Sequence, residues 1–507
     1  MRSIVLAAVP LLALAALLLL PGLLIGPSLD PSVFTQVAGA MREGATLYVE
    51  AWDHKPPGIY LLLAAAQTLL PFLDPWLVTW LVTLLATTGS GVVLLRTLRG
   101  LGVGPVAAML GAAAAVAAMS QYLTALGGGL TESVAVLPMA VGLHLALGDV
   151  RSPARAVTVG ALLAFSVLLS LPMAPAAVVV GLAVAIQAVR VARWGEIAGL
   201  VAGGLAPVAV VVAWLIATGA WDAALDAILG YAAAYRAANA DLGARLSAPV
   251  VTWTLLSYLY LIVPAALGAV RAVRDPGARR QAVVIGLAWV ILSLVLVALQ
   301  GRFFAHYAIP LALPLGLLAG MGFQRLGVLL SRARRPLVRA GLLAPFLAAL
   351  LISVAAALAG GRMEWLPVWR DHERSERVAE AIRASTGPDD AIWVWGNEPQ
   401  LYLGAQRSVA TAFSYLYPLV TPGYTTPTMI QATLADLEAD PPALVIDAGS
   451  RAPGVVGFQQ LLIPRPLTSD GRDLDILDPL RDFVGERYDE AATVDGWVIY
   501  ALRVATP

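Results

Sequence analysis

Residues 4–25, IVLAAVPLLALAALLLLPGLLI, form an apolar run that follows a single basic residue, Arg2. As a helix, a run of this length reaches across the roughly 30 Å hydrocarbon core of a bilayer. The run lacks a small-residue cleavage site, and further apolar runs follow it. We therefore interpret it as an uncleaved first membrane helix rather than as a signal peptide.

The composition of the whole chain agrees with this first run. Hydrophobic residues make up 59% of the 507 residues and charged residues 13%, which is about half the charged share of a soluble domain. Cysteine is absent and the four histidines lack metal-ligand spacing, so neither a disulfide nor a zinc site is expected. No cofactor is required by the sequence, nothing in it supports a divalent cation, and no basic patch outside the predicted cytoplasmic loops suggests nucleic acid.

Apolar runs of similar length recur along the chain and alternate with polar gaps that differ in charge. Arginines fill alternate gaps, whereas most acidic residues lie in the others. Because positively charged loops stay in the cytoplasm, the pattern predicts about eleven spans in the cytoplasmic membrane, a cytoplasmic N-terminus and an extracytoplasmic C-terminal region. The expected spans are 4–25, 75–95, 104–120, 131–149, 156–171, 174–189, 197–217, 250–270, 281–299, 304–323 and 339–360.

Two segments between these spans need an interpretation of their own. Residues 57–72 must not cross the membrane, because a crossing would move every later arginine cluster to the outside. This stretch is short and interrupted by Gln67 and Pro71, so we expect a helix that lies in the interface. Residues 218–250 form a long, amphipathic outer loop, and loops of this length are usually functional or disordered, so we expect a mobile lid.

Charge density rises after Gly360-Gly361, and this change divides the chain into a membrane module, residues 1–361, and an extracytoplasmic domain, residues 362–507. An amphipathic helix is predicted at 371–385. Short apolar runs predict strands at 391–396, 443–448 and 496–501. The predicted fold class is an α-helical polytopic membrane protein, with interfacial helices in the first outer loop and a small C-terminal α/β domain.

The first of these strands has two tryptophans on one face. Trp393 and Trp395 are two residues apart, and Asn397, Glu398 and Tyr402 follow them. Such a group is able to receive a sugar ring, but filling the core of the small domain is the favoured interpretation. We therefore expect the domain to position or screen the acceptor, with the bond-making groups in the membrane module.

The first outer loop, residues 26–58, contains the most distinctive polar residues. Lys55 is the only lysine in a chain whose other basic side chains are arginine and histidine. A compact ammonium suits a phosphate oxygen in a tight site; chance in an arginine-rich chain is the alternative. Asp30 is placed to act as a general base or to orient an acceptor, although Asp-Pro before an apolar run also begins many helices.

Two further polar clusters lie at predicted outer ends of spans. Residues 127–133, Gly-Gly-Gly-Leu-Thr-Glu-Ser, direct Glu132 to the same aqueous face as Asp30, and helix capping is the favoured alternative. Arg302, His306 and Tyr307 offer hydrogen-bond donors suited to a phosphate headgroup. Interfacial anchoring is the alternative for this cluster, but the Arg-x-x-x-His-Tyr spacing beside a helix start mildly favours function.

Together these residues resemble those of a known family. The residues that carry the resemblance are Asp30, Gly44, Tyr48, Trp52-Asp53-His54-Lys55-Pro56-Pro57-Gly58-Ile59-Tyr60, Leu130-Thr131-Glu132, His306-Tyr307, Pro310 and Pro314. They resemble bacterial polyprenyl-phosphate-sugar glycosyltransferases, which have the GT-C fold and are relatives of protein O-mannosyltransferases and of lipid A aminoarabinose transferases. The resemblance covers most of residues 1–325, and Asp-His-Lys-Pro-Pro is its most specific part.

The resemblance implies an active site on the outer face and a polyprenyl-phosphate sugar as donor. Lys55 takes the phosphate role and His306 with Tyr307 the headgroup role; from its own chemistry, Arg302 is expected to stabilise the departing phosphate together with Lys55. Asp30 takes the acidic role near the acceptor, with Glu132 as a second carboxylate; further site candidates are Tyr48, Asp53 and His54. Val33 and Phe34 stand where the aminoarabinose transferases have Arg and Tyr, which argues against a lipid A acceptor.

Two other functions remain as alternatives on the sequence alone. A transporter or flippase of lipid-linked sugars is expected to carry charged residues along a path through its spans. Here the spans are nearly free of charge and the polar groups crowd one face. A catalytically silent membrane scaffold is the second alternative. The sequence names neither the sugar nor the acceptor, which is a lipid, a glycan or a protein.

Overall fold

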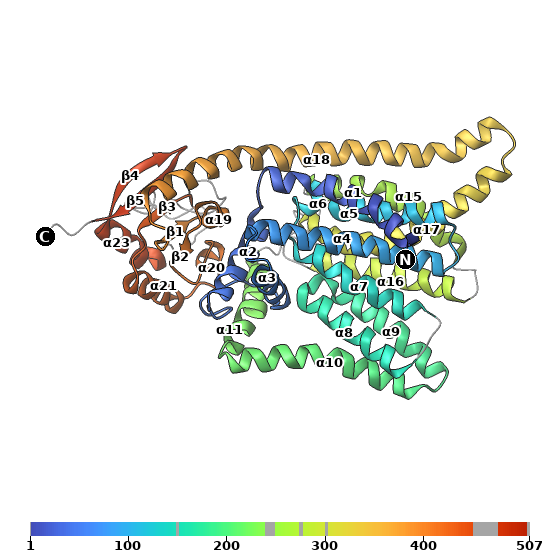
Figure 1. Cartoon of the computed structure of the whole chain (residues 1–507), viewed down its shortest axis with the longest axis horizontal. Coiled ribbons are helices and arrows are strands. Elements are labelled where there is room, and N and C mark those ends of the chain that lie inside the picture. The colour runs from blue at the N-terminus through green and yellow to red at the C-terminus, as the bar shows by residue number, and fades with distance from the viewer. Residues whose placement is uncertain are drawn as a thin grey trace.

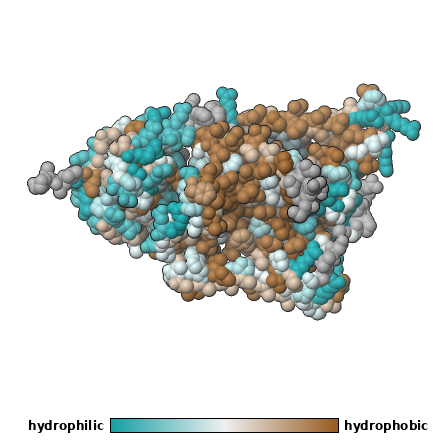
Figure 2. Space-filling model, in the orientation of Figure 1, coloured by the Kyte–Doolittle hydropathy of each residue, from teal (hydrophilic) through white to brown (hydrophobic). Residues whose placement is uncertain are grey.

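The computed structural model describes residues 2–148, 152–238, 249–272, 277–299, 303–449 and 475–503. A bundle of helices makes up most of the molecule, and a small sheet domain sits at one end of it (Figure 1). Figure 2 shows apolar side chains over the bundle, and hydrophilic ones over the sheet domain and at the opposite end. This distribution is the one expected of a protein whose middle lies in a bilayer.

Six described helices are long and apolar enough to cross a membrane, so the chain is a multi-pass membrane protein. They are α4 (Pro75–Gly100), η1 with α9 (Leu171–Arg190), α10 (Trp194–Ala217), α16 (Ala278–Leu299), η3 with α17 (Ala305–Arg332), and the first part of α18 (Pro336–Arg362). Two bent helix pairs also pass the same test. These are α1 (Arg2–Leu24) with α2 (Leu29–Arg42), bent by 82°, and α14 (Pro249–Ser257) with α15 (Leu259–Ala272), bent by 57°.

Four shorter apolar helices complete this set. They are α3 (Gly58–Leu69), α5 (Pro105–Ser120), α7 (Thr131–Leu147) and α8 (Pro153–Leu169). All eleven expected runs coincide with a helix or a bent pair. The 12-residue α3 is only about 18 Å long, too short to cross. The total of about eleven spans stays a prediction.

Glycines allow several helices of the bundle to approach closely. A Cβ atom added at Gly160 of α8 would lie 2.1 Å from the carbonyl oxygen of Leu200 in α10, and one at Gly203 of α10 would lie 2.0 Å from that of Val157. Any side chain there would force the backbones apart. Small residues at such crossings are how helices pack where lipid supplies no hydrophobic drive.

Helix α18 (Pro336–Ser385) differs from the expected division of the chain. It runs for 50 residues without a break at Gly360-Gly361, and in Figure 1 it extends from the far end of the bundle into the sheet domain. The predicted boundary between 361 and 362 therefore falls inside one helix. The predicted amphipathic helix 371–385 is the last part of α18.

The C-terminal domain contains a five-stranded mixed sheet of order β2-β1-β3-β5-β4. The expected strands appear as β1 (Ala391–Trp395), β3 (Leu444–Asp447) and β5 (Trp497–Leu502). β2 (Ser408–Val409) and β4 (Tyr488–Val494) were not expected; β2 has two residues, and most of β4 is exposed. β1 is parallel to β2 and β3, and β5 is antiparallel to β3 and β4.

Helices cover both faces of this sheet. One face packs against the end of α18 and α19 (Gln400–Ala405), and the other against α21 (Pro427–Ala439) and α23 (Asp478–Arg487). Trp393 and Trp395 lie in the second core, each 1% exposed, with ring centroids 5.5 Å apart. They therefore fill the core and offer no platform to a sugar.

Candidate functional site

The first outer loop folds back on itself before it reaches Lys55. Its turn contains Gly44 (φ +108°) and Tyr48 (φ +68°), a left-handed conformation that is uncommon for a tyrosine. The Tyr48 hydroxyl donates a hydrogen bond to the Lys55 carbonyl, 2.7 Å away. At Gly58 an added Cβ would lie 2.5 Å from the carbonyl oxygen of Leu168, so glycine is required where α3 begins against α8. These constraints fix the backbone on both sides of Lys55.

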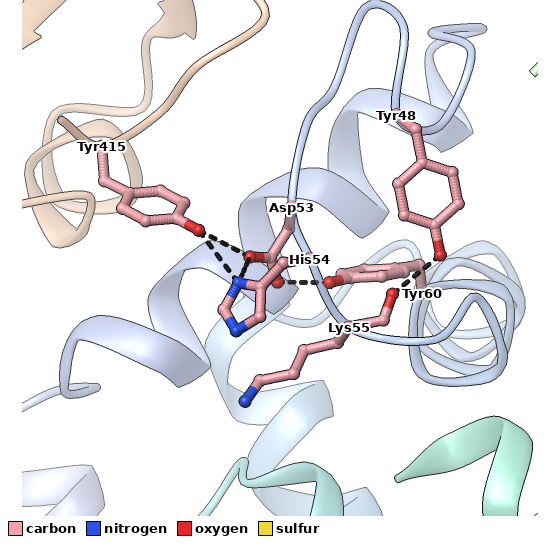
Figure 3. A network of polar contacts seen from close by, with 6 residues as sticks. All are labelled: Tyr48, Asp53, His54, Lys55, Tyr60 and Tyr415. Atoms are coloured by element: carbon pink, nitrogen blue, oxygen red, sulfur yellow. Dashed lines mark hydrogen bonds and ion pairs between the residues drawn. The ribbon is translucent and has the colours of Figure 1, made fainter. Parts of the chain in front are cut away.

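Asp53 is the centre of a hydrogen-bond network, which we call the Asp53 network (Figure 3). Its members are Asp53, His54, Tyr60 and Tyr415; Figure 3 also draws Tyr48, which bonds the carbonyl of Lys55. The Asp53 carboxylate is 1% exposed and accepts from Tyr415 Oη at 2.8 Å, from His54 Nδ1 at 2.9 Å and from the hydroxyl of Tyr60. Burial alone would raise the pKa of Asp53, but His54, Tyr60 and Lys55 lower it to about 2. Asp53 is therefore a fully bonded, ionised carboxylate inside the protein.

No dashed line joins the ammonium of Lys55 to this network in Figure 3. Lys55 is half-buried, and no ion pair or hydrogen bond joins its ammonium to any part of the chain that the structure describes. Burial acts to lower the pKa of Lys55, but nearby Asp30 and Glu132 raise it above its ordinary value, with smaller effects of Tyr307 and Asp53. The group is thus a persistent cation, and no residue within the described ranges is bonded to it as a counter-ion.

The two predicted carboxylates lie at the starts of two different helices. Asp30 is in the first turn of α2 and is partly exposed, whereas Glu132 is in the first turn of α7 and is 2% exposed. One oxygen of Glu132 accepts from Thr131 Oγ1 at 3.2 Å, and the other, Oε1, is buried without a partner among the described residues. The N-cap positions are Ser28 and Leu130, so neither carboxylate is the cap residue.

Three successive glycines bring these helix starts together. Gly127, Gly128 and Gly129 have φ values of +83°, +115° and +84°, which other residues rarely adopt. A Cβ atom at Gly129 would lie 2.6 Å from Cβ of Pro31, the residue after Asp30. The glycine loop thereby packs the start of α2 against the segment that leads into Glu132.

His306 and Tyr307 lie in η3 (Ala305–Ala308), at the start of α17. The His306 ring is 6% exposed and stacks on Phe304 with centroids 5.4 Å apart; its centroid lies 4.7 Å from that of Tyr307. Both residues interact electrostatically with the Lys55 group. We call the resulting set the Lys55 cluster, which comprises Asp30, Lys55, Glu132, His306 and Tyr307. Arg302 lies outside the described residues.

The remaining site candidates lie outside the Lys55 cluster. Asp53 and His54 belong to the Asp53 network, and the Tyr48 hydroxyl bonds the carbonyl of Lys55, so the polar groups of all three bind protein atoms. Tyr415, which no sequence pattern had indicated, comes from the C-terminal domain, and no periodicity in residues 413–417 distinguishes it. Among the described residues, no group of three or more His, Asp or Glu side chains is arranged to hold a metal ion.

An aromatic group joins the first outer loop to two distant segments. Trp52 packs against Tyr231 of α12 (Tyr231–Ala238) and against Phe413 and Tyr424 of the C-terminal domain, with ring centroids 5.3–6.1 Å apart. Its backbone N–H donates to the carbonyl of Ala412 at 2.9 Å. The described part of the expected lid, residues 218–238, therefore packs beside the loop that carries Lys55, and residues 239–248 lie outside the described residues.

Comparison with known proteins identifies the fold. No family model and no curated protein matches the chain. The chain is similar to the crystal structure of ArnT from Cupriavidus metallidurans bound to undecaprenyl phosphate, with 16% identity, a TM-score of 0.54, and coverage of 98% of this chain and 99% of that one. For ArnT from the same organism in the apo state, the identity is 16%, the TM-score 0.50, and the coverage 94% and 93%. The chain therefore has the GT-C fold, as the sequence predicted.

Proposed function

We propose that this chain is a membrane glycosyltransferase, which moves a sugar from a polyprenyl-phosphate donor to an acceptor at the end of the bundle that carries the C-terminal domain. The observation that carries the proposal is the Lys55 ammonium, which is charged and half-buried near the carboxylates of Asp30 and Glu132 and has no bonded counter-ion among the described residues. A protein keeps such a cation at a cost unless it binds an anion. The similar ArnT structure contains undecaprenyl phosphate, an anion that suits this site.

The proposed chemistry is a displacement at the anomeric carbon of the donor sugar. The bond from C1 to the phosphate oxygen breaks, its electron pair stays on the polyprenyl phosphate, and the acceptor oxygen or nitrogen bonds to C1. Charge on the phosphate grows during this step, and a fixed ammonium stabilises that charge more than it stabilises the ground state. Lys55 performs this role, with His306 and Tyr307 beside it.

The acceptor must lose a proton in this reaction, and Asp30 is the group we propose to accept it. Its carboxylate is partly exposed, and no hydrogen bond or ion pair to it is found within the described ranges. Glu132 is more deeply buried, and one of its oxygens has no partner in the described part of the chain. We assign Glu132 to the sugar side of the site, where a buried acceptor oxygen is available to a hydroxyl group.

To consume polyprenyl-phosphate sugars on the outer face, the protein must have one orientation in the membrane. We propose that its C-terminal domain is extracytoplasmic. Contacts place the relevant loops at one end: Trp52 bonds to Ala412, and Tyr424 donates to Asp226 at 2.7 Å. Reporter fusions after Arg99, Arg155 and Arg280 should be cytoplasmic, and fusions at 125, 240 and 450 should be external. A cytoplasmic signal at 450 would reverse the proposed orientation.

Donor consumption is the experiment that tests the activity itself. The purified protein in lipid nanodiscs is supplied with polyprenyl phosphates carrying different radiolabelled sugars and with extracted envelope acceptors. We expect at least one donor to release polyprenyl phosphate and to label an acceptor, and Lys55→Ala to abolish this transfer. Movement of intact donor across proteoliposome membranes without cleavage would instead identify a transporter. No cleavage and no movement with any donor would indicate a scaffold.

A further inference from the structure

The hydroxyl of Tyr415 is a polar contact between the C-terminal domain and the first outer loop, residues 26–58. This group donates to Asp53 Oδ1 at 2.8 Å and lies 3.2 Å from His54 Nδ1. Tyr415 is 4% exposed, so water has little access to replace it. Asp53, whose carboxylate accepts this hydrogen bond, is two residues before Lys55. Two prolines, Pro56 and Pro57, directly follow Lys55.

The segment around Lys55 is held from both parts of the molecule. The membrane module supplies Tyr60, which bonds Asp53, and Tyr48, which bonds the carbonyl of Lys55. The C-terminal domain supplies Tyr415 and the carbonyl of Ala412, which accepts from Trp52 N–H. Asp53 is thus hydrogen-bonded from both parts of the molecule.

We infer that Tyr415 is a positioning residue, through which the C-terminal domain completes the phosphate site at Lys55. The inference rests on the proposed function and deepens it. It also changes the role that the sequence suggested for the domain. If the domain only presented the acceptor, loss of the domain would not affect donor binding. If Tyr415 positions Lys55, loss of Tyr415 weakens the binding of the donor phosphate itself.

The physical reason is the burial of Asp53. Without the Tyr415 hydroxyl, the ionised carboxylate loses one of three donors in a place that water hardly reaches, and such a carboxylate moves toward other donors or toward solvent. Lys55, two residues along, then leaves its position among Asp30 and Glu132. The ring of Tyr415 packs against Trp52 with centroids 6.0 Å apart, and Tyr415→Phe keeps this packing while removing the hydroxyl.

The test compares two lipids that differ only in the phosphate. Binding of undecaprenyl phosphate and of undecaprenol is measured with the full-length protein in nanodiscs, for wild type, Tyr415→Phe, Lys55→Ala and the double variant. We expect Tyr415→Phe to weaken the binding of undecaprenyl phosphate about tenfold and to leave the binding of undecaprenol almost unchanged. In the Lys55→Ala background, Tyr415→Phe should add nothing, because both act on one interaction.

Tyr488→Phe is the matched control. Tyr488 is a buried tyrosine of the same domain, and its hydroxyl donates to the carbonyl of Pro442 at 2.8 Å, within the domain. This variant should bind both lipids as wild type does. It therefore measures what the loss of any buried tyrosine hydroxyl in this domain does to lipid binding.

Three outcomes would overturn the inference. One is an unchanged affinity of Tyr415→Phe for undecaprenyl phosphate while Lys55→Ala binds it weakly, which would leave the proposed function standing. Another is an equal loss for both lipids, or a loss also in Tyr488→Phe, which would reduce Tyr415 to a structural role. The third is wild-type affinity of Lys55→Ala, which would remove the phosphate site and the inference with it.

Discussion

The Asp53 network and the Lys55 cluster lie side by side, but the charged group at the centre of each differs in how fully it is hydrogen-bonded. Asp53 is buried and saturated by three donors, whereas Lys55, two residues later, has neighbouring carboxylates and no bonded partner among the described residues. A saturated charge stabilises structure and has no capacity left for a ligand. An unsaturated one costs stability and is available to a ligand. The first network is therefore structural, and the second is where the donor phosphate is expected to bind.

The largest expected effect is on catalysis, at Lys55. Lys55→Ala should reduce transfer by about a thousandfold, since an ammonium fixed at the departing phosphate contributes on the order of 4 kcal/mol to transition-state stabilisation. Lys55→Arg should restore only part of the rate, because the planar guanidinium does not reproduce a compact point charge. Transfer rates measure the activity of each variant, and size-exclusion profiles measure separately whether it is folded. A fully active Lys55→Ala protein would exclude Lys55 from the site.

At Asp53 the main effect should be on stability instead. Asp53→Ala leaves the hydroxyls of Tyr60 and Tyr415 buried without their acceptor, which we expect to cost about 3 kcal/mol. Thermal unfolding in detergent should therefore shift down for Asp53→Ala and much less for Lys55→Ala. Equal shifts in the two variants would contradict the distinction between a structural network and a binding cluster.

A smaller effect is expected at the glycine loop that places the two carboxylates. Gly129→Ala introduces a Cβ 2.6 Å from Pro31 Cβ and 2.9 Å from the Trp76 ring, which should displace Asp30 and reduce transfer about tenfold. Gly128→Ala is the control, because Gly128 also has positive φ but its nearest contact would be 3.5 Å away. If both variants lose activity equally, backbone strain explains the loss rather than the spacing of the helices.

The smallest expected effect is that of pH on the Asp53 network. Folding lowers the pKa of Asp53 to about 2, so its contribution to stability is fully present above its unfolded value near 3.8 and is lost as the pH falls through about 2. Thermal stability between pH 5 and 9 should therefore show no step from Asp53. A step within this range that disappears in Asp53→Asn would show that the carboxylate titrates in the folded protein near neutral pH.

The sequence predicted much of this architecture but only part of the site. Each apolar run that was expected to be a span coincides with a helix, and three short apolar runs coincide with strands. These elements were predictable because a buried helix or strand shows its apolar pattern within a single segment of sequence. The segments 26–58, 127–133 and 300–310 were expected on one face of the membrane, because the predicted topology placed all three there. Tyr415 and the unbroken α18 were not predicted. Tyr415 acquires its role only through a contact 362 residues away in sequence, and helix α18 continues through two glycines whose local preference is against helix.

The most direct measurement of the central claim is an experimental structure of the protein in nanodiscs with undecaprenyl phosphate bound. We predict that the phosphate lies among Asp30, Lys55, Glu132 and His306, with one phosphate oxygen about 2.8 Å from Lys55 Nζ. Asp53 should remain bonded to Tyr60 and Tyr415 in that structure. A phosphate bound elsewhere, with Lys55 paired to Asp30 or Glu132 instead, would contradict the account.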